Sequence, residues 1–341
     1  MNIEEVSFGI YNNQEIKEYT LDNGNYLSLK ILTLGAIIKE VKFKGKNRVL
    51  GFNNVEDYIN SRFYFGALVG RVAGRISNGE FHIGEKSFKL DQNEGKTCLH
   101  GGKEGFTFKV WELEDSVVSE EFASVTLKYI SQDLDSGFPG VFTVYVKYTI
   151  SKDNSFKIEY SGFSSKDTPV TLTNHSYFNL NNDLSNDILD HYLKIDADEY
   201  IRLDKNNIPI EISRVEESPF DFRKSKIIKR DMDLNHEELK VTKGYDHPFV
   251  LNDGSANQVE LFCKESGIKL NLFTTEPVVV VYCSNNLGGG YTLIEGEETF
   301  KYQGVCLETQ WYPDALNQEF LPNNVLDQGK EYYSKTKFKF S

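Results

Sequence analysis

The sequence predicts an all-β protein, built as a large antiparallel β-sandwich with few short helices. Hydrophobic and polar residues alternate with a period of two in segment after segment, which is the pattern of strands with one buried face. The chain of 341 residues also contains 24 Phe and 19 Tyr, and aromatic residues favour a pleated, half-buried surface. Many strands with few helices favour a sandwich over an α/β fold.

The predicted strands follow one another along the chain and are separated by turns rich in Gly, Asn and Asp. The clearest strand patterns are FTVYVKYTIS from Phe142, SFKIEYSGFS from Ser155, HYLKIDADEYIRLD from His191, VELFCKESGIKLNLF from Val259 and YYSKTKFKF from Tyr332. The turn signals include LDNGN, KDNS, LNDGS and NLGGG, whose residues accept the positive φ angles of tight connections. The best helical patterns are NVEDYINS and DMDLNHEELK. Because no linker or internal repeat divides the chain, we expect one domain over residues 1–341.

Charge and composition exclude several classes of function. The formal net charge is -13 and the basic residues are scattered, which disfavours a nucleic-acid partner. The N-terminus is acidic where a signal peptide is basic, and the longest apolar run, PVVVVYC, is too short to span a bilayer. We therefore expect a cytoplasmic protein, a monomer or homodimer, with no membrane partner. The dispersed cysteines, Cys98, Cys263, Cys283 and Cys306, form no C-x-x-C pair and are expected to be reduced, buried thiols.

Three of the six histidines stand at the ends of strand-like runs, where catalytic groups often lie. They are His100 in TCLHGGKEGF, His175 in TLTNHSYFNL and His247 in GYDHPF. A lone histidine at a strand end is more often a structural residue, and each of the three taken alone favours that role. The other three, His82, His191 and His236, lie among residues patterned like a surface. No pair or cluster has the spacing of metal ligands, so we expect no metal site.

One carboxylate lies in a strand-like run near the C-terminal end, in VCLETQWYPDALNQ at residues 305–318. Alternation places Cys306, Glu308 and Gln310 on one face of this strand and the apolar residues between them on the other. Glu308 then lies either on a half-solvated face or in a cleft. The following WYPDALNQ supplies aromatic and polar groups that can stack on a sugar ring and bond its hydroxyls, which favours a small-ligand pocket.

Six motifs occur in order over most of the chain: GRVAGRI, NEGKTCLHGG, TLTNHSYFNL, KGYDHPFVL, FTTEPVVVVYC and VCLETQWYPDALNQ. Together they resemble the aldose 1-epimerase family. The resemblance implies a galactose mutarotase-like supersandwich with a sugar cleft across one sheet. It also implies a cofactor-free isomerase that interconverts the α and β anomers of free hexoses such as galactose and glucose.

The resemblance also implies roles for particular residues. Glu308 is expected to be the general base and His175 the general acid, because one group must take the O1 proton while another gives a proton to the ring oxygen. The expected sugar-binding residues are Arg75, His100, Asp246, Glu276, Tyr282 and Tyr177. Arg75 is matched because it closes the AGRI element, and Arg71 is the alternative. We expect apolar neighbours to make Glu308 more basic, with Arg75 and His100 compensating its charge.

Two positions depart from the family pattern and bear on sugar preference. Gly74 stands where many relatives carry Asn, and Glu276 where they often carry Gln. Three other functions stay open at this point. They are a non-catalytic carbohydrate-binding protein, an epimerase acting on a phosphorylated hexose or maltose, and a glycoside hydrolase that pairs Glu308 with Glu276 or Asp246. A phosphate would need a basic cluster that the sequence does not show. A thiol mechanism through Cys306 or Cys98 lacks the context that lowers a thiol pKa.

Overall fold

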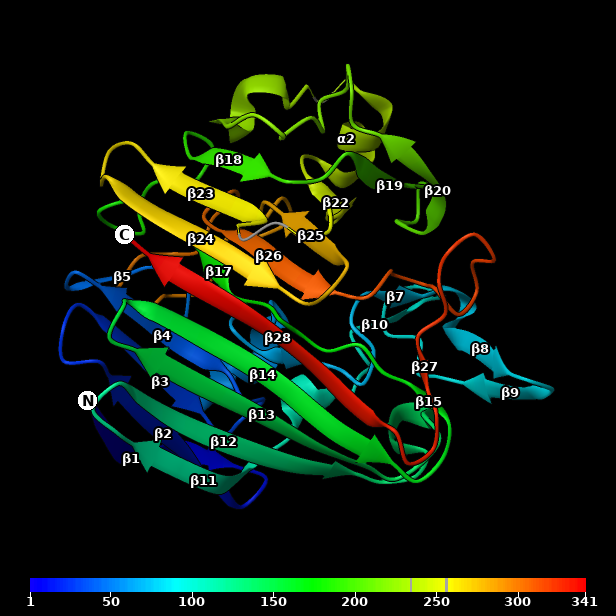
Figure 1. The fold of residues 1–341 in the computed structure, drawn as a ribbon, viewed down its shortest axis with the longest axis horizontal. Helices are drawn as coiled ribbons and strands as arrows, with labels where there is room; N and C mark the ends of the chain where they lie inside the picture. The colour runs from blue at the N-terminus through cyan, green and yellow to red at the C-terminus, as the bar shows by residue number, and fades with distance from the viewer. Residues whose placement is uncertain (234, 255–256) are drawn as a thin grey trace.

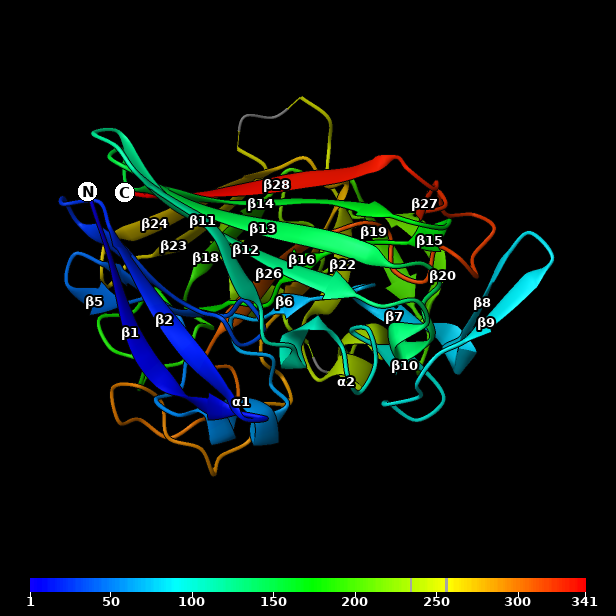
Figure 2. The same cartoon turned by 90° about the horizontal axis from the view of Figure 1, so that it is seen from below.

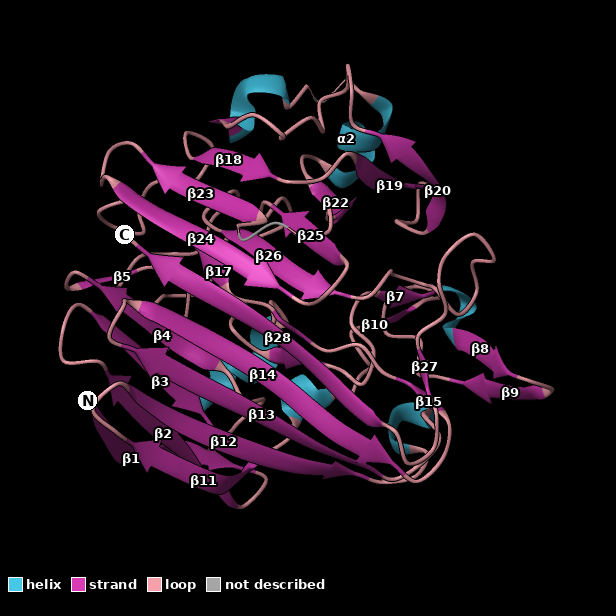
Figure 3. Ribbon diagram, viewed as in Figure 1, coloured by secondary structure: helices cyan, strands magenta, loops and turns pink. Residues whose placement is uncertain are grey.

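Strands make up most of the fold in the computed structural model, which describes residues 1–233, 235–254 and 257–341. The α-helices of these ranges are α1 (Val55–Ser61) and α2 (Glu237–Thr242), and both are short (Figure 3). The predicted all-β class and the predicted helix NVEDYINS are therefore confirmed. Only the last part of DMDLNHEELK enters α2. Position 234 of that segment and position 255 of the predicted turn LNDGS lie outside the described residues.

The largest sheet has nine strands in the order β11-β12-β13-β14-β28-β24-β23-β18-β21, and all neighbours are antiparallel. Its strands are β11 (Glu112–Val118), β12 (Phe122–Ser131), β13 (Phe142–Ser151), β14 (Ser155–Ser164), β18 (Tyr192–Ile195), β21 (Lys226–Ile227), β23 (Val259–Cys263), β24 (Ile268–Thr274) and β28 (Glu331–Phe340). The strand segments predicted from alternation all lie here, except the end of HYLKIDADEYIRLD. This sheet faces the viewer in Figure 1.

Two further sheets pack behind the nine-stranded sheet. A five-stranded sheet has the order β1-β2-β3-β4-β5, and a six-stranded sheet has the order β17-β26-β25-β22-β19-β20. The first consists of β1 (Asn2–Tyr11), β2 (Gln14–Asp22), β3 (Leu27–Leu32), β4 (Ile38–Phe43) and β5 (Lys46–Asn47). The second consists of β17 (Tyr177–Phe178), β19 (Glu199–Leu203), β20 (Pro209–Arg214), β22 (Asp246–Val250), β25 (Val278–Tyr282) and β26 (Val305–Gln310). The six-stranded sheet lies below the nine-stranded sheet in Figure 2.

Short two-stranded pairs and single turns of 3-10 helix complete the fold. The pairs are β6 (Leu68–Val69) with β16 (Thr173–Asn174), β7 (Arg75–Ile76) with β10 (Cys98–Leu99), β8 (Glu80–Ile83) with β9 (Lys86–Lys89), and β15 (Thr168–Pro169) with β27 (Val325–Leu326). The 3-10 turns are η1 (Ser77–Gly79), η2 (Phe106–Phe108), η3 (Asp135–Gly137) and η4 (Ile228–Asp231). The β8–β9 hairpin projects from the body of the molecule in both ribbon views (Figures 1 and 2).

The main hydrophobic core fills the space between these sheets. It joins the inward residues of all three large sheets, for example Leu29 of β3, Val144 of β13 and Val279 of β25, each fully buried. Inward side chains of a strand alternate with half-exposed ones, as β13 shows from Phe142 to Tyr148. Burial of each large apolar side chain contributes about 1.5–3 kcal/mol, so this layer supplies most of the driving force for folding.

The interpretation of His191 as a residue of the surface is wrong. His191 is almost fully buried, although its neighbours in the chain are patterned like a surface. Its Nε2 accepts a hydrogen bond of 2.9 Å from the backbone N–H of Leu180. The loop at residues 180–190 folds over this histidine, and single-strand alternation cannot reveal a loop that packs from above.

Candidate active site

The floor of the site is one face of the six-stranded sheet. Residues directly opposite each other on antiparallel strands point to the same side. Asp246 of β22 pairs with Tyr282 of β25, and Tyr282 pairs with Cys306 of β26. Cys306 also pairs with Tyr177 of β17. Strand register thus places four residues from distant parts of the chain in one row, and Glu308, two positions after Cys306, belongs to the same face.

The two faces of β26 divide as alternation predicts. Val305 and Leu307 pack into the main core, on the face opposite Glu308. Every residue of β26 is nevertheless buried, and only 4% of Glu308 is exposed. The interpretation of Glu308 as a solvated residue on a half-exposed strand is therefore wrong, because loops from other parts of the chain cover this face.

One wall of the site is formed by the β7–β10 pair. Leu99 pairs with Arg75, and the backbone N–H of His100 donates to the carbonyl of Gly74 at 3.0 Å. The N–H of Gly74 in turn donates to Nδ1 of His100 at 3.3 Å. Gly74 has a φ of +78°, a conformation that Gly and Asn adopt more readily than other residues. Glycine therefore suits this position of the turn.

The tight turn after His100 requires glycine. Gly101 has a φ of +83°, and a Cβ atom there would come within 2.0 Å of the carbonyl oxygen of Gly70. No side chain can be accommodated at that distance. The HGG sequence thus lets the His100 loop close against the strand that carries Arg75.

A second wall comes from the segment around His175. The N–H of His175 donates to the carbonyl of Ala67 at 2.9 Å, and the N–H of Gly66 donates to the carbonyl of His175 at 3.0 Å. The imidazole lies between two nearly parallel rings, Tyr177 at 5.0 Å and Tyr64 at 5.9 Å between ring centres. Helix α1 ends at Ser61, so Tyr64 reaches the site from the loop directly after it. Asn54 caps the start of this helix by accepting from the N–H of Asp57.

These walls enclose a cleft of about 240 Å³, a size that suits a small ligand. Of the residues expected from the sequence, all but Glu276 line the cleft, namely Arg75, His100, His175, Tyr177, Asp246, Tyr282 and Glu308. Further lining residues that sequence reasoning did not assign include Arg62, Tyr64, Glu94, Asn286 and Gln310. Glu94 lies in the motif NEGKTCLHGG, but nothing local indicates which residue it contacts.

Glu308 and His175 form the central pair of the cleft. Oε1 of Glu308 lies 3.6 Å from Nε2 of His175, and both side chains are about 95% buried. Burial, assisted by the nearby Asp246, raises the pKa of Glu308 to about 8, although Arg75 opposes this shift. Burial lowers the pKa of His175 to about 4. Because each group resists its charged form, the pair holds one proton between these pH values.

The other polar groups of the cleft are also shifted by burial. The pKa of Asp246 is raised, against the opposing effect of Arg75. The pKa of His100 is lowered well below its ordinary value by burial, and then by His175 and Arg75. A set of buried groups with strongly shifted pKa values in one cleft is typical of a catalytic site.

Arg75 does not bond Glu308 directly, contrary to the simplest expectation of a compensating partner. Its Nε and Nη2 atoms donate to the two carboxylate oxygens of Glu94 at 2.6 and 2.9 Å. This two-pronged pair fixes the guanidinium plane at the cleft wall. Arg75 therefore influences Glu308 through the electrostatic effect of its positive charge, which lowers the pKa of Glu308. Only the tertiary structure identifies Glu94 as the partner of Arg75.

Two arginines and one glutamate of the sequence interpretation can now be placed. Arg71, the alternative to Arg75, is buried outside the cleft, and its guanidinium donates to Ser131, Thr168 and the carbonyls of Pro139 and Gly140. It braces loops, whereas Arg75 lines the cleft. Glu276, expected to bind the substrate, lies outside the cleft lining, where burial raises its pKa to about 7 and Ser334 and Tyr332 are its hydrogen-bond partners.

His100, His175 and Glu308 could also be considered as metal ligands, because their ligand atoms lie within 4.8 Å of one another. The bond from the N–H of Gly74 to Nδ1 of His100 argues against this use. A neutral imidazole that accepts at Nδ1 carries its proton on Nε2, and that nitrogen is then a donor rather than a ligand. The cluster suits acid–base chemistry and hydroxyl binding.

The sequence pattern of the family described as aldose 1-epimerase matches residues 17–339. The chain belongs to the aldose 1-epimerase family. An aldose 1-epimerase from Haemophilus influenzae is 36% identical, with 99% of each chain covered. A galactose mutarotase from Rattus norvegicus is 38% identical, with 92% of this chain and 91% of the relative covered. The prediction of an epimerase, an isomerase of carbohydrate metabolism that takes a small sugar, is thereby confirmed.

Solved structures agree with this membership in the aldose 1-epimerase family. The galactose 1-epimerase from Lactobacillus acidophilus superposes with a TM-score of 0.89 at 28% identity, covering 100% of this chain and 98% of that one. A GalM/aldose epimerase homologue from C. elegans superposes with a TM-score of 0.86 at 28% identity, covering 94% and 98%. The galactose mutarotase-like fold expected from the motifs is confirmed. Among the described residues no helix is long and apolar enough to cross a bilayer.

Proposed function

We propose that this protein interconverts the α and β anomers of free hexoses such as galactose and glucose, with Glu308 as general base and His175 as general acid. The observation that carries the proposal is the buried pair itself, with Oε1 of Glu308 and Nε2 of His175 3.6 Å apart in a cleft of sugar-binding character. The names of the relatives from Rattus norvegicus and Lactobacillus acidophilus support galactose as a substrate.

The reaction moves two protons in opposite directions. Glu308, ionised, takes the proton from the O1 hydroxyl while His175, protonated, gives the Nε2 proton to the ring oxygen O5. The C1–O5 bond breaks, O1 becomes the aldehyde oxygen, and rotation about C1–C2 exposes the other face. Closure reverses both transfers, so each group returns to its starting state. One proton shared by the pair suffices, because the reactive form has it on His175 and not on Glu308.

The surrounding residues orient the sugar. Asp246 accepts hydrogen bonds from ring hydroxyls, and His100 donates from Nε2, because its Nδ1 is occupied by the N–H of Gly74. Arg75, held flat by Glu94, faces the cleft as a fixed cationic donor. Tyr282 and Tyr177 provide aromatic surface, and their hydroxyls are engaged by the N–H of Asn286 and the carbonyl of Phe63. Glu276 has no role in this scheme.

Charge at the cleft argues against a phosphorylated hexose. The lining contains two arginines, Arg62 and Arg75, but also three carboxylates, Glu94, Asp246 and Glu308. Arg75 is already paired with Glu94, so of the two lining arginines only Arg62 is left to meet a phosphate, a group that is usually bound by several basic donors. A thiol mechanism is also disfavoured, because burial raises the pKa of Cys98 to about 12 and that of Cys306 well above its usual value.

Several predictions from the sequence accompany this proposal. We expect the chain to act as one catalytic domain over residues 1–341 without a cofactor. A cytoplasmic location, a monomer or homodimer, and the absence of nucleic-acid partners are likewise predictions.

The decisive experiment is polarimetry of freshly dissolved sugars with the purified protein. We expect faster anomerisation of α-galactose and α-glucose and no effect on a phosphorylated hexose. Binding of sugar without acceleration would instead support a non-catalytic carbohydrate-binding protein. Release of sugar from an aryl galactoside would support a glycoside hydrolase.

A further inference from the structure

Cys306 contacts the proposed acid, and the mechanism above does not use it. Its Sγ atom lies 3.4 Å from Nδ1 of His175, although 131 residues separate the two in the chain. Cys306 is fully buried, and 4% of His175 is exposed. The register of β26 with β17 and β25 places Cys306 opposite Tyr177 and Tyr282, on the sheet face that carries the thiol to the edge of the imidazole.

The aromatic neighbours fix the plane of the His175 ring but not its direction within that plane. Tyr177 and Tyr64 stack on the two faces, at interplanar angles of 23° and 28°. His100 meets the ring at 83°. A half-turn about the Cβ–Cγ bond would keep all of these contacts, yet it would exchange Nδ1 with Cδ2 and Nε2 with Cε1. Nε2 would then leave Glu308, and a carbon atom would face the carboxylate.

We propose that Cys306 is a positioning residue for the reaction, whose thiol holds Nδ1 of His175 so that Nε2 faces Glu308 and the sugar. This inference rests on the proposed function, because it assumes that His175 is the acid. Cys306 does not touch the substrate and acts only through the imidazole. The thiol can donate to Nδ1 when the ring is neutral and can accept from Nδ1–H when the ring is protonated.

Sulfur is a weak hydrogen-bond acceptor, and this weakness matters for the positioning role of Cys306. A catalytic or metal-binding histidine is commonly oriented by a carboxylate or carbonyl, which makes the ring more basic. Sulfur accepts a hydrogen bond weakly, so Cys306 orients the ring while adding little stability to the imidazolium. His175 therefore remains a strong acid that readily transfers its proton to a sugar oxygen.

The pH dependence of the pair depends on every group that faces the ring. These are Glu308 and Cys306 on β26, Tyr177 on β17, Tyr282 on β25, His100 after β10, Tyr64 after α1 and the backbone carbonyl of His175 itself, which raises the pKa of the ring. Of these groups, only Cys306 is changed in the variants below. If the acid side of the pH–activity profile shifts in the Cys306 variants, the shift therefore measures how the group that contacts Nδ1 changes the pKa of His175.

Three variants test the inference by anomerisation kinetics over a range of pH. Cys306→Ala removes the partner of Nδ1, and we expect kcat to fall about tenfold while KM stays within about twofold, as for other residues that orient a functional group. Cys306→Ser restores a partner that accepts more strongly than sulfur. We expect it to recover kcat to within about threefold and to move the acid side of the pH profile to higher pH.

Cys283→Ala is the matched control, because Cys283 is also fully buried, follows β25, and makes no described contact with His175. We expect it to lower thermal stability to a similar degree but to leave kcat and the pH profile unchanged. Equal losses of kcat in Cys306→Ala and Cys283→Ala, or no recovery in Cys306→Ser, would overturn the positioning role. An inactive wild-type protein would instead overturn the proposed function.

Discussion

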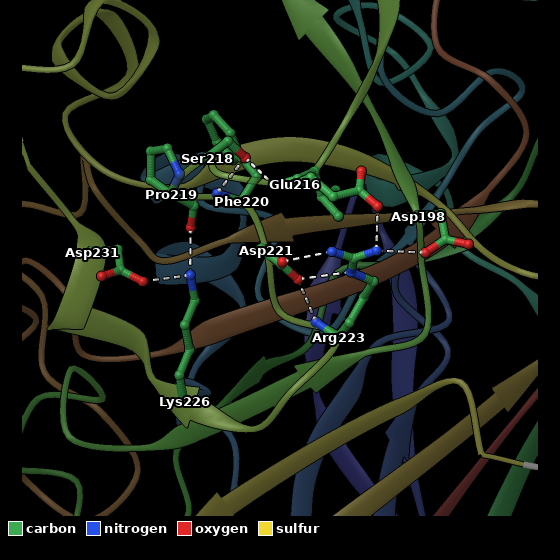
Figure 4. Close-up of polar contacts among 10 residues, drawn as sticks. Asp198, Glu216, Ser218, Pro219, Phe220, Asp221, Arg223, Lys226 and Asp231 are labelled. Carbon is green, nitrogen blue, oxygen red and sulfur yellow. Dashed lines mark hydrogen bonds and ion pairs between the residues drawn. The ribbon is translucent and has the colours of Figure 1, made fainter.

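The cleft around Glu308 and the Arg223 cluster both contain carboxylates and cationic side chains. The pKa of the carboxyl is raised for Glu308 in the cleft and lowered for Asp221 in the cluster. The Arg223 cluster consists of Asp198, Glu216, Asp221, Arg223, Lys226 and Asp231 (Figure 4). There Arg223 bonds three carboxylates at 2.5–3.1 Å, and Lys226 bonds Asp231 and the carbonyl of Pro219 at 2.7 and 2.8 Å. The hydrogen bonds from Arg223 lower the pKa of Asp221. In the cleft, burial raises the pKa of Glu308 to about 8.

The difference shows what separates a structural charge from a reactive one. The carboxylates of the Arg223 cluster are partly exposed and have direct cationic partners, which stabilise the loop at residues 215–231. Glu308 is only 4% exposed and has no direct Lys or Arg partner among the described residues, since Arg75 is bonded to Glu94. A carboxylate so placed is a stronger base, and the folded state is less stable when it is ionised.

The largest effect is expected for Glu308→Gln. The substitution keeps the shape but removes the base, so kcat should fall about a hundredfold to ten-thousandfold while sugar still binds. Polarimetry with α-galactose measures the rate, and calorimetry measures binding. Glu216→Gln in the Arg223 cluster is the matched control and should retain full activity. Retained activity in Glu308→Gln would show that Glu308 is not the base, and that the cleft carboxylate is no more reactive than those of the Arg223 cluster.

The pH profile of wild-type activity tests the shared proton. Between the pKa values of about 4 for His175 and about 8 for Glu308 the pair holds one proton. The fraction with that proton on His175 does not change with pH in this window, so kcat/KM should be flat. It should fall about tenfold per pH unit below the window, where both groups are protonated, and above it, where neither group holds a proton. A single rise near the ordinary carboxylate pKa would contradict this account.

Stability should respond to Glu308→Gln in the direction opposite to activity. The pKa of Glu308 is raised on folding from 4.5 to about 8, so its favourable protonated state is lost as pH rises through this range. The variant should therefore exceed the wild type by about 4 kcal/mol in the free energy of unfolding at pH 8, with the difference vanishing near pH 4. Urea unfolding at both pH values measures this. A variant less stable at pH 8 would show that Glu308 is well compensated.

Asp246→Asn should act on affinity rather than on turnover. The amide cannot accept as strongly from sugar hydroxyls, and one hydrogen bond to a charged group is worth about 1.5–3 kcal/mol. We expect KM to rise about tenfold with kcat within about twofold. An unchanged KM would exclude Asp246 from sugar binding.

The smallest effect is expected for Asp221→Asn in the Arg223 cluster. The pKa of Asp221 is lowered in the folded state, so its stabilising effect is present above the ordinary carboxylate pKa and is lost as pH falls through the folded value. Its partly exposed ion pair is screened by water, and the loss should be at most about 1 kcal/mol at pH 7 and absent near pH 2. Activity should not change. A loss of activity would mean that the two regions are coupled.

The sequence alone determined the strands, their faces and the family. Alternation located β13, β14 and β28 because the side chains of a strand must point alternately inward and outward, and each pattern is complete within about ten residues. The same local rule put Cys306, Glu308 and Gln310 on one face. The helical pattern NVEDYINS located α1, and the cap that Asn54 provides at its start is a local interaction of the same kind.

Only the tertiary structure decided which polar residues meet. Arg75 rather than Arg71 faces the cleft, Glu276 lies outside it, Glu94 bonds Arg75, and Cys306 contacts His175. These contacts depend on the register of strands and loops far apart in the chain. The burial that shifts the pKa values of Glu308 and His175 has the same origin, because loops from other segments remove water from a face that alternation leaves open.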